Sequence, residues 1–240
     1  MKSILSVPSW VIPGTYAENL RFLEKQNEVK GVELLFFIYD NEVKTQLDSE
    51  WDEIRDYSKR FIYTAHLPEN LIPAHGELIA RLAPLVRHFI IHPFKTIPEA
   101  EASLLGEWSK QYGVKFLAEN TNPGLLESLL PHLNLCPETA GLCMDTGHLL
   151  MEEKSPAEFY KKHKTHICEI HLHAVDREQT VIDGRLADHR RLRPDESWLH
   201  ELLPLLDDYS GVINLEIFSW EEAGAGIEVL KKYFKNPIDK

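Results

Sequence analysis

Short runs of apolar, β-branched and aromatic residues recur along the chain and predict eight β-strands. These runs occur at about residues 3–8, 31–37, 61–66, 88–92, 114–119, 141–145, 167–173 and 212–217. The segments between them have the spacing of amphipathic helices. Ser155-Pro156 followed by Glu158 predicts one helix start, and Pro98 with Gly113 brackets another helix. Strands therefore alternate with helices throughout the sequence.

This alternation predicts an α/β fold with parallel strands, because each crossover helix covers a sheet face that would otherwise be exposed. Eight units in 240 residues fit a closed (β/α)8 TIM barrel. An open, doubly wound sheet is the alternative fold, but no GxGxxG or GxxxxGK[ST] motif follows the first strand. No Gly/Ser linker or low-complexity tract divides the chain, so we expect one domain over residues 1–240.

Potential metal ligands stand at nearly equal intervals, each at the end of a predicted strand. They are His66, His92, Glu119, Asp145 and His171, spaced 26, 27, 26 and 26 residues apart. Glu216 follows after 45 residues, and the polar stretch from Asp176 to Glu196 accounts for the surplus as a long loop after the seventh strand. The carboxyl ends of barrel strands open onto one face, so these side chains should converge there.

Side-chain alternation within the strands supports the same arrangement. The seventh strand has one face made of Glu169, His171 and His173, and another made of Cys168, Ile170 and Leu172. In the fourth strand, Ile90 and His92 are expected to point into the barrel. Helices cover the outside of a barrel sheet, so the polar face is predicted to be the interior. Buried polar groups there need partners.

Imidazole nitrogens and carboxylate oxygens together suit zinc or manganese, and a bridging carboxylate can hold two ions about 3.5–4 Å apart. A single inward histidine is more often a hydrogen-bonded core residue. Six such groups in register predict a site for one to three divalent ions. The alternative is a polar mouth without metal, which holds a substrate by hydrogen bonds. Glu33 is expected to face the interior and to hydrogen-bond a neighbour rather than a metal.

Three further histidines lie near the predicted mouth. His148, three residues after Asp145, is expected to be a ligand at the start of the following loop or helix. His189, in the long loop, is expected to be a ligand that closes over the site, with a solvated basic turn as the alternative. His173, two residues beyond His171, is predicted to contact substrate, and the alternatives are a hydrogen-bond partner of a ligand or a plain loop residue.

The long loop also concentrates cations in an otherwise acidic protein. They are Arg185, Arg190, Arg191 and Arg193. Beside a metal site, such a cluster predicts binding of a phosphate or carboxylate of the substrate. A plain surface loop is the alternative.

Composition excludes several classes of protein. The chain carries 26 basic and 38 acidic residues, a net charge of −12, and so acidic a surface disfavours undirected binding to nucleic acid. Cys136, Cys143 and Cys168 lack CxxC spacing and are expected to be reduced packing residues, as in the cytoplasm. No apolar run approaches 18 residues, so neither secretion nor membrane spanning is expected. Nothing in the sequence indicates an oligomeric state.

Eight segments carry a resemblance to a known superfamily. They are GVELLFF, YTAHLPEN, FIIHPF, FLAENTNP, GLCMDTGHLL, EIHLHAV, DHRRL and INLEIFSW. In these segments the chain resembles the xylose-isomerase-like superfamily of TIM barrels, which includes sugar isomerases and epimerases and AP endonucleases of the endonuclease IV type. The resemblance spans almost the entire chain.

The two branches of this superfamily imply different metal sites. In the isomerase and epimerase branch, one metal is held by groups that match Glu119, Asp145, His171 and Glu216. In the endonuclease branch, a three-metal cluster adds groups that match His66, His92, His148 and His189. Ala187 stands where that pattern has an aspartate, and Asp188 is next to His189. Whether Asp188 or His173 completes a third metal site is therefore open.

A narrower resemblance is carried by GVELLFF, TAHLPENL, DTGHLL, HLHAV with a following DH, and LEIFS with an acidic continuation. In this combination the chain resembles the cobamide-remodelling phosphodiesterases, which hydrolyse the nucleotide-loop phosphodiester of corrinoids. The resemblance implies a metal-dependent hydrolase with a small-molecule substrate, in which Glu119 and Glu216 take part in catalysis.

Three other functions stay open. A sugar or sugar-phosphate isomerase or epimerase would use Glu119 and Glu216 to move a proton between adjacent carbons. An AP endonuclease is disfavoured by the net charge of −12 and by the tight spacing between units. A binding barrel without catalysis predicts that no metal is bound.

Overall fold

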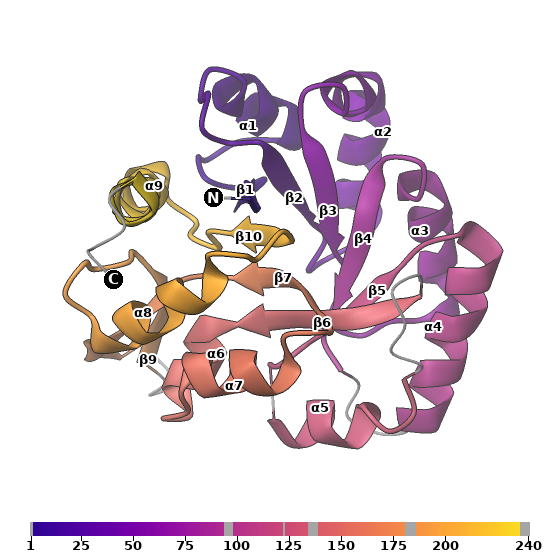
Figure 1. Ribbon diagram of the computed structural model, residues 1–240. Helices are drawn as coiled ribbons and strands as arrows, with labels where there is room; N and C mark the ends of the chain where they lie inside the picture. Colours follow the sequence, from indigo (N-terminus) through magenta and orange to yellow (C-terminus); the bar gives the residue numbers. More distant parts are fainter. Residues whose placement is uncertain (1, 94–97, 122, 134–138, 181–185, 236–240) are drawn as a thin grey trace.

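Eight parallel strands close into a barrel in the order β1-β10-β7-β6-β5-β4-β3-β2 (Figure 1). The computed structural model describes residues 2–93, 98–121, 123–133, 139–180 and 186–235. The barrel strands are β1 (Ile4–Pro8), β2 (Gly31–Leu35), β3 (Ile62–His66), β4 (Val86–Ile91), β5 (Phe116–Glu119), β6 (Ala140–Asp145), β7 (Ile167–His171) and β10 (Val212–Asn214). The closed barrel confirms the predicted fold and excludes the open sheet.

Helices follow the strands and surround the barrel (Figure 1). They are α1 (Tyr16–Leu23), α2 (Asn41–Tyr57), the 3-10 helix η1 (Pro73–His75), α3 (Gly76–Leu82), α4 (Pro98–Tyr112), α5 (Pro123–Leu129), α6 (Thr146–Met151), α7 (Pro156–His163), α8 (Ser197–Leu202), the 3-10 helix η2 (Leu203–Leu206) and α9 (Trp220–Lys235). The boundaries of α4 and α7 confirm the predicted ones: Gly113 follows α4 at φ 67°, and the Ser155 hydroxyl caps α7. No helix within the described ranges is long and apolar enough to cross a membrane.

Alternate strand positions face two different environments. Outward side chains such as Phe89, Ile91 and Ile170 pack with the helices in one continuous apolar core. A small apolar layer of Ile90, Leu117 and Cys143 forms a separate cluster inside the barrel, with Cys168 packed against it. Many other interior side chains are polar or charged and almost completely buried, among them Glu33, Thr64, His66, His88, Glu119, Asp145, Glu169, His171 and Asn214. The predicted inward polar face is therefore present.

Two details differ from the sequence-based expectations. The polar stretch after the seventh strand is not a plain loop, because β8 (Ala174–Thr180) and β9 (Leu186–Arg190) pair as an antiparallel hairpin that contacts α6. Cys168 also packs toward the interior instead of sharing the outer face with Ile170. Between β6 and β7 the pairing jumps from Ile167 to Glu169, so Cys168 is an extra residue in a bulge and strict alternation fails there.

Gly211 lies where the closing strand β10 meets its neighbours. Its carbonyl accepts a hydrogen bond from the backbone N–H of Ile4 at 2.9 Å. A Cβ atom at this position would lie 2.4 Å from the carbonyl oxygen of Cys168 and 2.2 Å from the hydroxyl oxygen of Tyr209. Because the backbone of β7 cannot give way cheaply, any side chain here would push β10 away from β7.

We therefore predict that Gly211→Ala lowers the free energy of unfolding by about 1–3 kcal/mol, the usual cost of overpacking. Gly106→Ala on α4 is the matched control, since a Cβ there meets nothing within 4 Å. The control should be neutral or more stable by up to about 1 kcal/mol. Denaturant unfolding of the two variants tests this, and equal stability of Gly211→Ala and the wild type would contradict it.

Candidate metal centre

Six strands bring candidate ligands to the carboxyl end of the barrel. The last residues of β3, β5, β6 and β7 are His66, Glu119, Asp145 and His171. His92 follows β4 directly, and Glu216 lies two residues beyond β10. Parallel barrel strands all end at the same face, so equal spacing in the sequence becomes convergence in space.

A first group of side chains surrounds Nδ1 of His171. It consists of Glu119, Asp145, His171 and Glu216, each 3% exposed or less. Nδ1 of His171 lies 3.1 Å from Glu216 Oε2, 3.6 Å from Glu119 Oε1 and 3.9 Å from Asp145 Oδ2. Within the described chain, this nitrogen has no partner in hydrogen-bond geometry.

The first group has the chemistry of a divalent metal site. Nε2 of His171 donates to Glu33 Oε2 at 2.8 Å, so Nδ1, which faces the carboxylates, is the nitrogen that would bind an ion on release of its proton. One imidazole nitrogen with three carboxylate oxygens suits Zn²⁺ or Mn²⁺. Buried carboxylates at such close range need a cation to offset their charge. The side chains present therefore fit a divalent ion.

A second group shares Glu119 with the first. It consists of His66, His92 and Glu119. Oε2 of Glu119 lies 3.0 Å from His66 Nε2 and 3.4 Å from His92 Nε2. The other oxygen, Oε1, lies 3.6 Å from His171 Nδ1 and 3.8 Å from His148 Nε2. The two oxygens of one carboxylate thus face two different ligand sets, which is the arrangement of a carboxylate that bridges two ions.

A third group, made of His173, His189 and Glu216, is less suited to a metal. The backbone N–H of His189 donates to Nδ1 of His173 at 3.0 Å, so Nδ1 is unprotonated and Nε2 carries the proton. Nε2 then donates to Asp145 Oδ2 at 3.0 Å. His173 therefore orients a candidate ligand in this structure. It is 0% exposed and does not line the mouth cavity described below, and its contact with substrate stays a prediction.

His189 and Asp188 form a pair at the rim of the site. His189 adopts φ 52°, and its Nδ1 lies 3.0 Å from Asp188 Oδ1 while its Nε2 lies 3.6 Å from Glu216 Oε2. Asp188 thus contacts the far side of the imidazole ring, as partners of metal-binding histidines commonly do. Ala187 is buried and offers no ligand atom. The structure places Asp188 beside His189 and keeps it out of the candidate ligand groups.

The sequence Asp145-Thr146-Gly147-His148 assembles one side of the site. Asp145 Oδ1 accepts a hydrogen bond from the backbone N–H of His148 and caps α6. The Thr146 hydroxyl accepts from the backbone N–H of His173 at 3.0 Å. Gly147 makes room for His173, because a Cβ there would lie 1.9 Å from Cε1 of that ring. Each residue of the motif therefore positions a candidate ligand or its partner.

Buried asparagine side chains also hydrogen-bond a candidate ligand or its partner. The side-chain amide of Asn120 donates to the carbonyl of Asp145 at 2.9 Å, and its oxygen accepts from the Asp145 backbone N–H at 2.8 Å. The side-chain amide of Asn214 donates to Glu33 Oε2 at 3.0 Å, the same oxygen that accepts from His171. Glu33 therefore hydrogen-bonds its neighbours as the sequence predicted, and through His171 it supports a candidate ligand.

The electrostatics of the site keep two of the candidate carboxylate ligands ionised. Burial opposes charge on Glu119 and Glu216, but the facing His171 ring holds the pKa of both carboxyls well below its ordinary value. Burial raises the pKa of Glu33 to about 8, although the contact with His171 acts in the opposite direction. Burial disfavours charge on His189, but Glu216 and Asp188 outweigh it and raise the pKa to about 11. The carboxylates thus stay ionised, and the His171 and His189 rings offset part of their charge.

A cavity of about 480 Å³ opens above this centre. Its polar lining consists of Glu69, His92, Glu119, His148, His189 and Glu216. Its apolar lining consists of Phe37, Ile38 and Phe218, and the last two are 64% and 40% exposed. The mouth therefore combines a floor of candidate metal ligands with an apolar wall.

The predicted arginine cluster does not line this cavity. Arg190, Arg191 and Arg193 lie with Asp176 and Glu222 at a separate cavity of about 220 Å³ beside the hairpin. The backbone N–H of Arg191 donates to Glu222, and its side chain is exposed. Arg185 lies outside the described residues.

Sequence reasoning missed a second buried pair deeper in the barrel. Nε2 of His88 contacts Glu169 Oε2, and Thr64 donates to Glu169 Oε1 at 3.3 Å. His88 has the same strand parity as His92, so the alternation pattern contained the signal for its inward position. No comparable signal marked Phe37 or Phe218, because apolar residues in loops also fit ordinary packing.

Comparisons with known proteins agree with this fold. A family model described as Xylose isomerase-like TIM barrel matches residues 100–233. The crystal structure of the probable 3-DHS dehydratase AsbF of Bacillus anthracis is similar at TM-score 0.68 and 14% identity, with 98% of this chain and 99% of that chain covered. Among curated protein sequences, none matches the chain significantly.

Two further solved structures have the same fold. Endonuclease IV of Thermus thermophilus is similar at TM-score 0.64 and 13% identity, over 96% of this chain and 98% of that chain. The 3-keto-D-glucoside 4-epimerase YcjR of E. coli is similar at TM-score 0.63 and 13% identity, over 98% and 100%. At these identities the likeness concerns the fold alone.

We predict that Gly147→Ala weakens binding of Zn²⁺ or Mn²⁺ about 10–100-fold, the usual effect of losing a ligand's supporting contact. The added methyl displaces His173 and with it the hydrogen bond to Asp145. Chelator-competition titration measures the affinity. Gly224→Ala on α9 is the control, since its nearest contact is an ordinary one of 3.9 Å to Trp220. Equal metal affinity of Gly147→Ala and the control would contradict the role of His173.

We also predict that Glu33→Ala weakens metal binding about 10–100-fold, because His171 loses the acceptor that fixes its tautomer. Glu33→Gln retains an acceptor oxygen and should recover a large part of the affinity. The same titration applies, with the melting temperature of each chelator-treated variant measured alongside. Equal affinities for Glu33→Ala and Glu33→Gln would show that the hydrogen bond to His171 is not what matters.

Proposed function

The chain belongs to the xylose isomerase-like TIM barrel family, and we propose that it is a metal-dependent phosphodiesterase that hydrolyses the nucleotide-loop phosphodiester of cobamides. Hydrolysis adds water across the P–O bond between phosphate and ribose and gives cobinamide phosphate and an α-riboside. The proposed substrate is a small molecule, and the net charge of −12 argues against a nucleic-acid substrate.

The observation that carries the proposal is the position of Glu119 between two ligand groups. Its Oε2 faces His66 and His92, and its Oε1 faces His171. A one-metal isomerase needs only the group around His171, so the histidines on the other side of Glu119 would have no catalytic purpose. Two adjacent ions are the usual arrangement for cleaving a phosphodiester.

Charge balance supports the same choice. The first and second groups together contain three carboxylates, those of Glu119, Asp145 and Glu216. Two divalent ions carry more positive charge than these carboxylates carry negative charge, whereas one ion carries less. A centre with two ions therefore attracts an anionic phosphodiester, and a centre with one ion suits a neutral sugar.

Divalent ions held by these groups would lower the pKa of a bound water toward about 7 and offset the charge on phosphate oxygens. The residues of the chain hold and orient the reacting groups. Glu119 and Glu216 present carboxylates to the cavity floor, while His92, His148 and His189 face the cavity. Asn120 and His173 keep Asp145 in place from behind.

The shape of the mouth supports a substrate with a broad apolar body. A volume of about 480 Å³ suits a nucleotide-sized group, within the range of about 300–1,000 Å³ common for ligand sites. Ile38 and Phe218 are exposed at the rim, and apolar groups exposed together commonly mark a contact surface. In this proposal the macrocycle of the corrinoid lies against them.

A sugar or sugar-phosphate isomerase or epimerase is the second candidate. It is favoured by the completeness of the first group, since Glu119, Asp145, His171 and Glu216 form a full ligand set for one ion. In that function Glu119 and Glu216 would exchange a proton with adjacent carbons of the substrate.

The test is mass spectrometry of the products after metal-loaded protein is incubated with adenosylcobalamin. We expect release of α-ribazole and the corresponding cobinamide phosphate by the wild type. Glu119→Gln should lose about 10²–10³-fold in rate, since it removes several kcal/mol of stabilisation. Glu107→Gln, an exposed glutamate on α4, is the matched control and should be unaffected.

A double variant, His66→Ala with His92→Ala, separates the two candidates. The phosphodiesterase predicts loss of cobamide hydrolysis and of one metal ion per chain by elemental analysis. The isomerase predicts one ion in both proteins and turnover of a ketose or ketose phosphate by both. If adenosylcobalamin stays intact although the protein is verified to hold two ions at the site, the phosphodiesterase proposal is wrong.

A further inference from the structure

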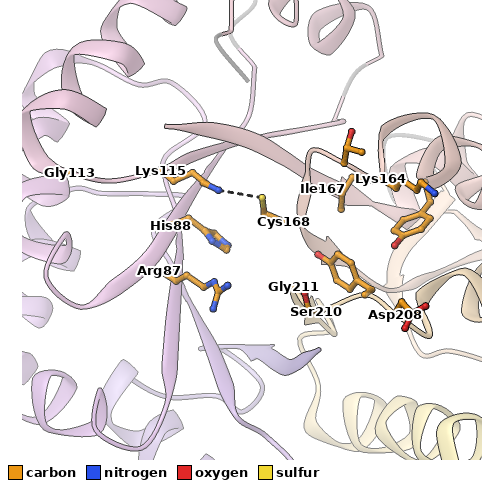
Figure 2. A pocket seen from close by; sticks show the side chains of 13 residues that line it. Arg87, His88, Gly113, Lys115, Lys164, Ile167, Cys168, Asp208, Ser210 and Gly211 are labelled. Atoms are coloured by element: carbon orange, nitrogen blue, oxygen red, sulfur yellow. Dashed lines mark hydrogen bonds between the residues drawn. The ribbon is translucent and has the colours of Figure 1, made fainter. Parts of the chain in front are cut away.

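A second cavity lies at the end of the barrel opposite the candidate metal centre. Its volume is about 750 Å³, and it is open to solvent beneath the amino-terminal ends of β4, β5 and β7 (Figure 2). The lining residues come from the start of β4, the turn before β5, the segment from α7 into β7, and the loop from Asp208 to Gly211 before β10. It shares no lining residue with the mouth cavity.

Three cations gather around this cavity although the protein is acidic. They are Arg87, Lys115 and Lys164. Across the ranges that the structure describes, none of the three is within ion-pair distance of a carboxylate. The one acidic lining residue, Asp208, is held by Lys2 at 2.7 Å. The cavity is therefore a positively charged hollow in a chain of net charge −12.

The negative charge nearest the floor is already compensated. Glu169 is 0% exposed and is engaged by His88 and by the hydroxyl of Thr64. His88 is 2% exposed and forms part of the floor. Figure 2 shows Arg87, His88 and Lys115 on one side of the cavity and Cys168 opposite Lys115. The three cations are thus not needed to neutralise the interior of the barrel.

Helix ends explain only part of this charge. The carboxyl ends of α4 and α7 lie near the cavity, and their partial negative charge favours nearby lysines such as Lys115 and Lys164. Arg87 lies on β4 itself, as the second residue of the strand, and not in a turn that directly follows a helix. Cations from a strand and from two separate turns thus line one cavity. Such an arrangement is expected where they bind a shared anionic ligand.

The rest of the lining provides further contacts of the right kind. Tyr160 and Tyr209 are each 7% exposed, and their rings stand at 81° with centroids 6.1 Å apart. They offer an aromatic wall beside the cations, and Thr165 and Ser210 add hydroxyl groups. Lysines and arginine with hydroxyl donors are typical of phosphate recognition, and an aromatic wall suits the organic part of a metabolite.

We propose that this cavity is a second ligand site, which binds a small molecule carrying a phosphate group. Lys115 and Arg87 contact the phosphate, and the wall of Tyr160 and Tyr209 contacts the remainder of the molecule. The site does not depend on the proposed catalytic function, because it lies at the other end of the barrel and involves none of the candidate metal ligands.

Cys168 supplies a direct reporter of occupancy. Its Sγ lies 3.6 Å from Nζ of Lys115, and the side chain is half-buried at the cavity (Figure 2). A ligand bound between Lys115 and Arg87 would cover this thiol. The rate of its alkylation by iodoacetamide, followed on the peptide that contains it, therefore measures binding without any reading of activity. Cys143 is fully buried and serves as the internal reference.

The experiment titrates the protein with inorganic pyrophosphate and with adenosine monophosphate, with citrate at equal ionic strength as the comparison anion. We expect both phosphate compounds to slow alkylation of Cys168 saturably below about 10 mM, while citrate has little effect. Arg87→Ala and Lys115→Ala should each raise the concentration for half-protection about tenfold, the cost of one charge-assisted hydrogen bond. Lys110→Ala, an exposed lysine on α4, should leave it unchanged.

Three outcomes would overturn the proposal. The first is an alkylation rate that does not change up to about 10 mM of either phosphate compound, a concentration that already covers weak millimolar binding. The second is equal protection by citrate, which would mean a general effect of anions. The third is protection that survives in both Arg87→Ala and Lys115→Ala. Half-protection concentrations are compared instead of absolute rates, because removing Lys115 alters the surroundings of the thiol itself.

Discussion

The burial of carboxylates inside the barrel is the constraint on which the rest of the structure depends. Glu33, Glu119, Asp145, Glu169 and Glu216 are each 3% exposed or less. Moving a charge out of water is costly unless a partner of opposite charge or a set of hydrogen bonds compensates for it. Imidazole rings meet these carboxylates throughout the barrel, and His171 touches the largest number of them. Much of the barrel interior is therefore polar and charged, whereas the continuous apolar core lies between the strands and the helices.

This constraint explains why the supporting contacts are so specific. Glu33 fixes one nitrogen of His171, and the other nitrogen faces the carboxylates. The backbone of His189 fixes the tautomer of His173, which in turn orients Asp145. A change in one such contact leaves a buried charge without its partner, so its effect is expected to reach the candidate metal ligands even though the changed residue is not one of them.

The two ends of the barrel have opposite electrostatic character. Carboxylates dominate the carboxyl end, which suits cations and, once these are bound, an anionic reacting group. Arginine and lysines dominate the hollow at the amino end, where the carboxylate of Glu169 is covered by His88. Under the two proposals, a chain with a net charge of −12 would bind anions at two separate places, for two different physical reasons.

The sequence by itself determined the barrel and the ligand register. Strand-helix alternation and a spacing of about 26 residues suffice for this, because parallel strands end at one face and side chains alternate across a sheet.

Only the tertiary structure decided which side chains from distant parts of the chain contact one another, because these contacts depend on distances and directions that the sequence does not give. Glu119 divides its two oxygens between His66 and His171, and His173 hydrogen-bonds Asp145. Arg190 and Arg191 lie beside the hairpin instead of the mouth. The cationic hollow combines Arg87, Lys115 and Lys164, which share no pattern in the sequence and meet only because the barrel closes.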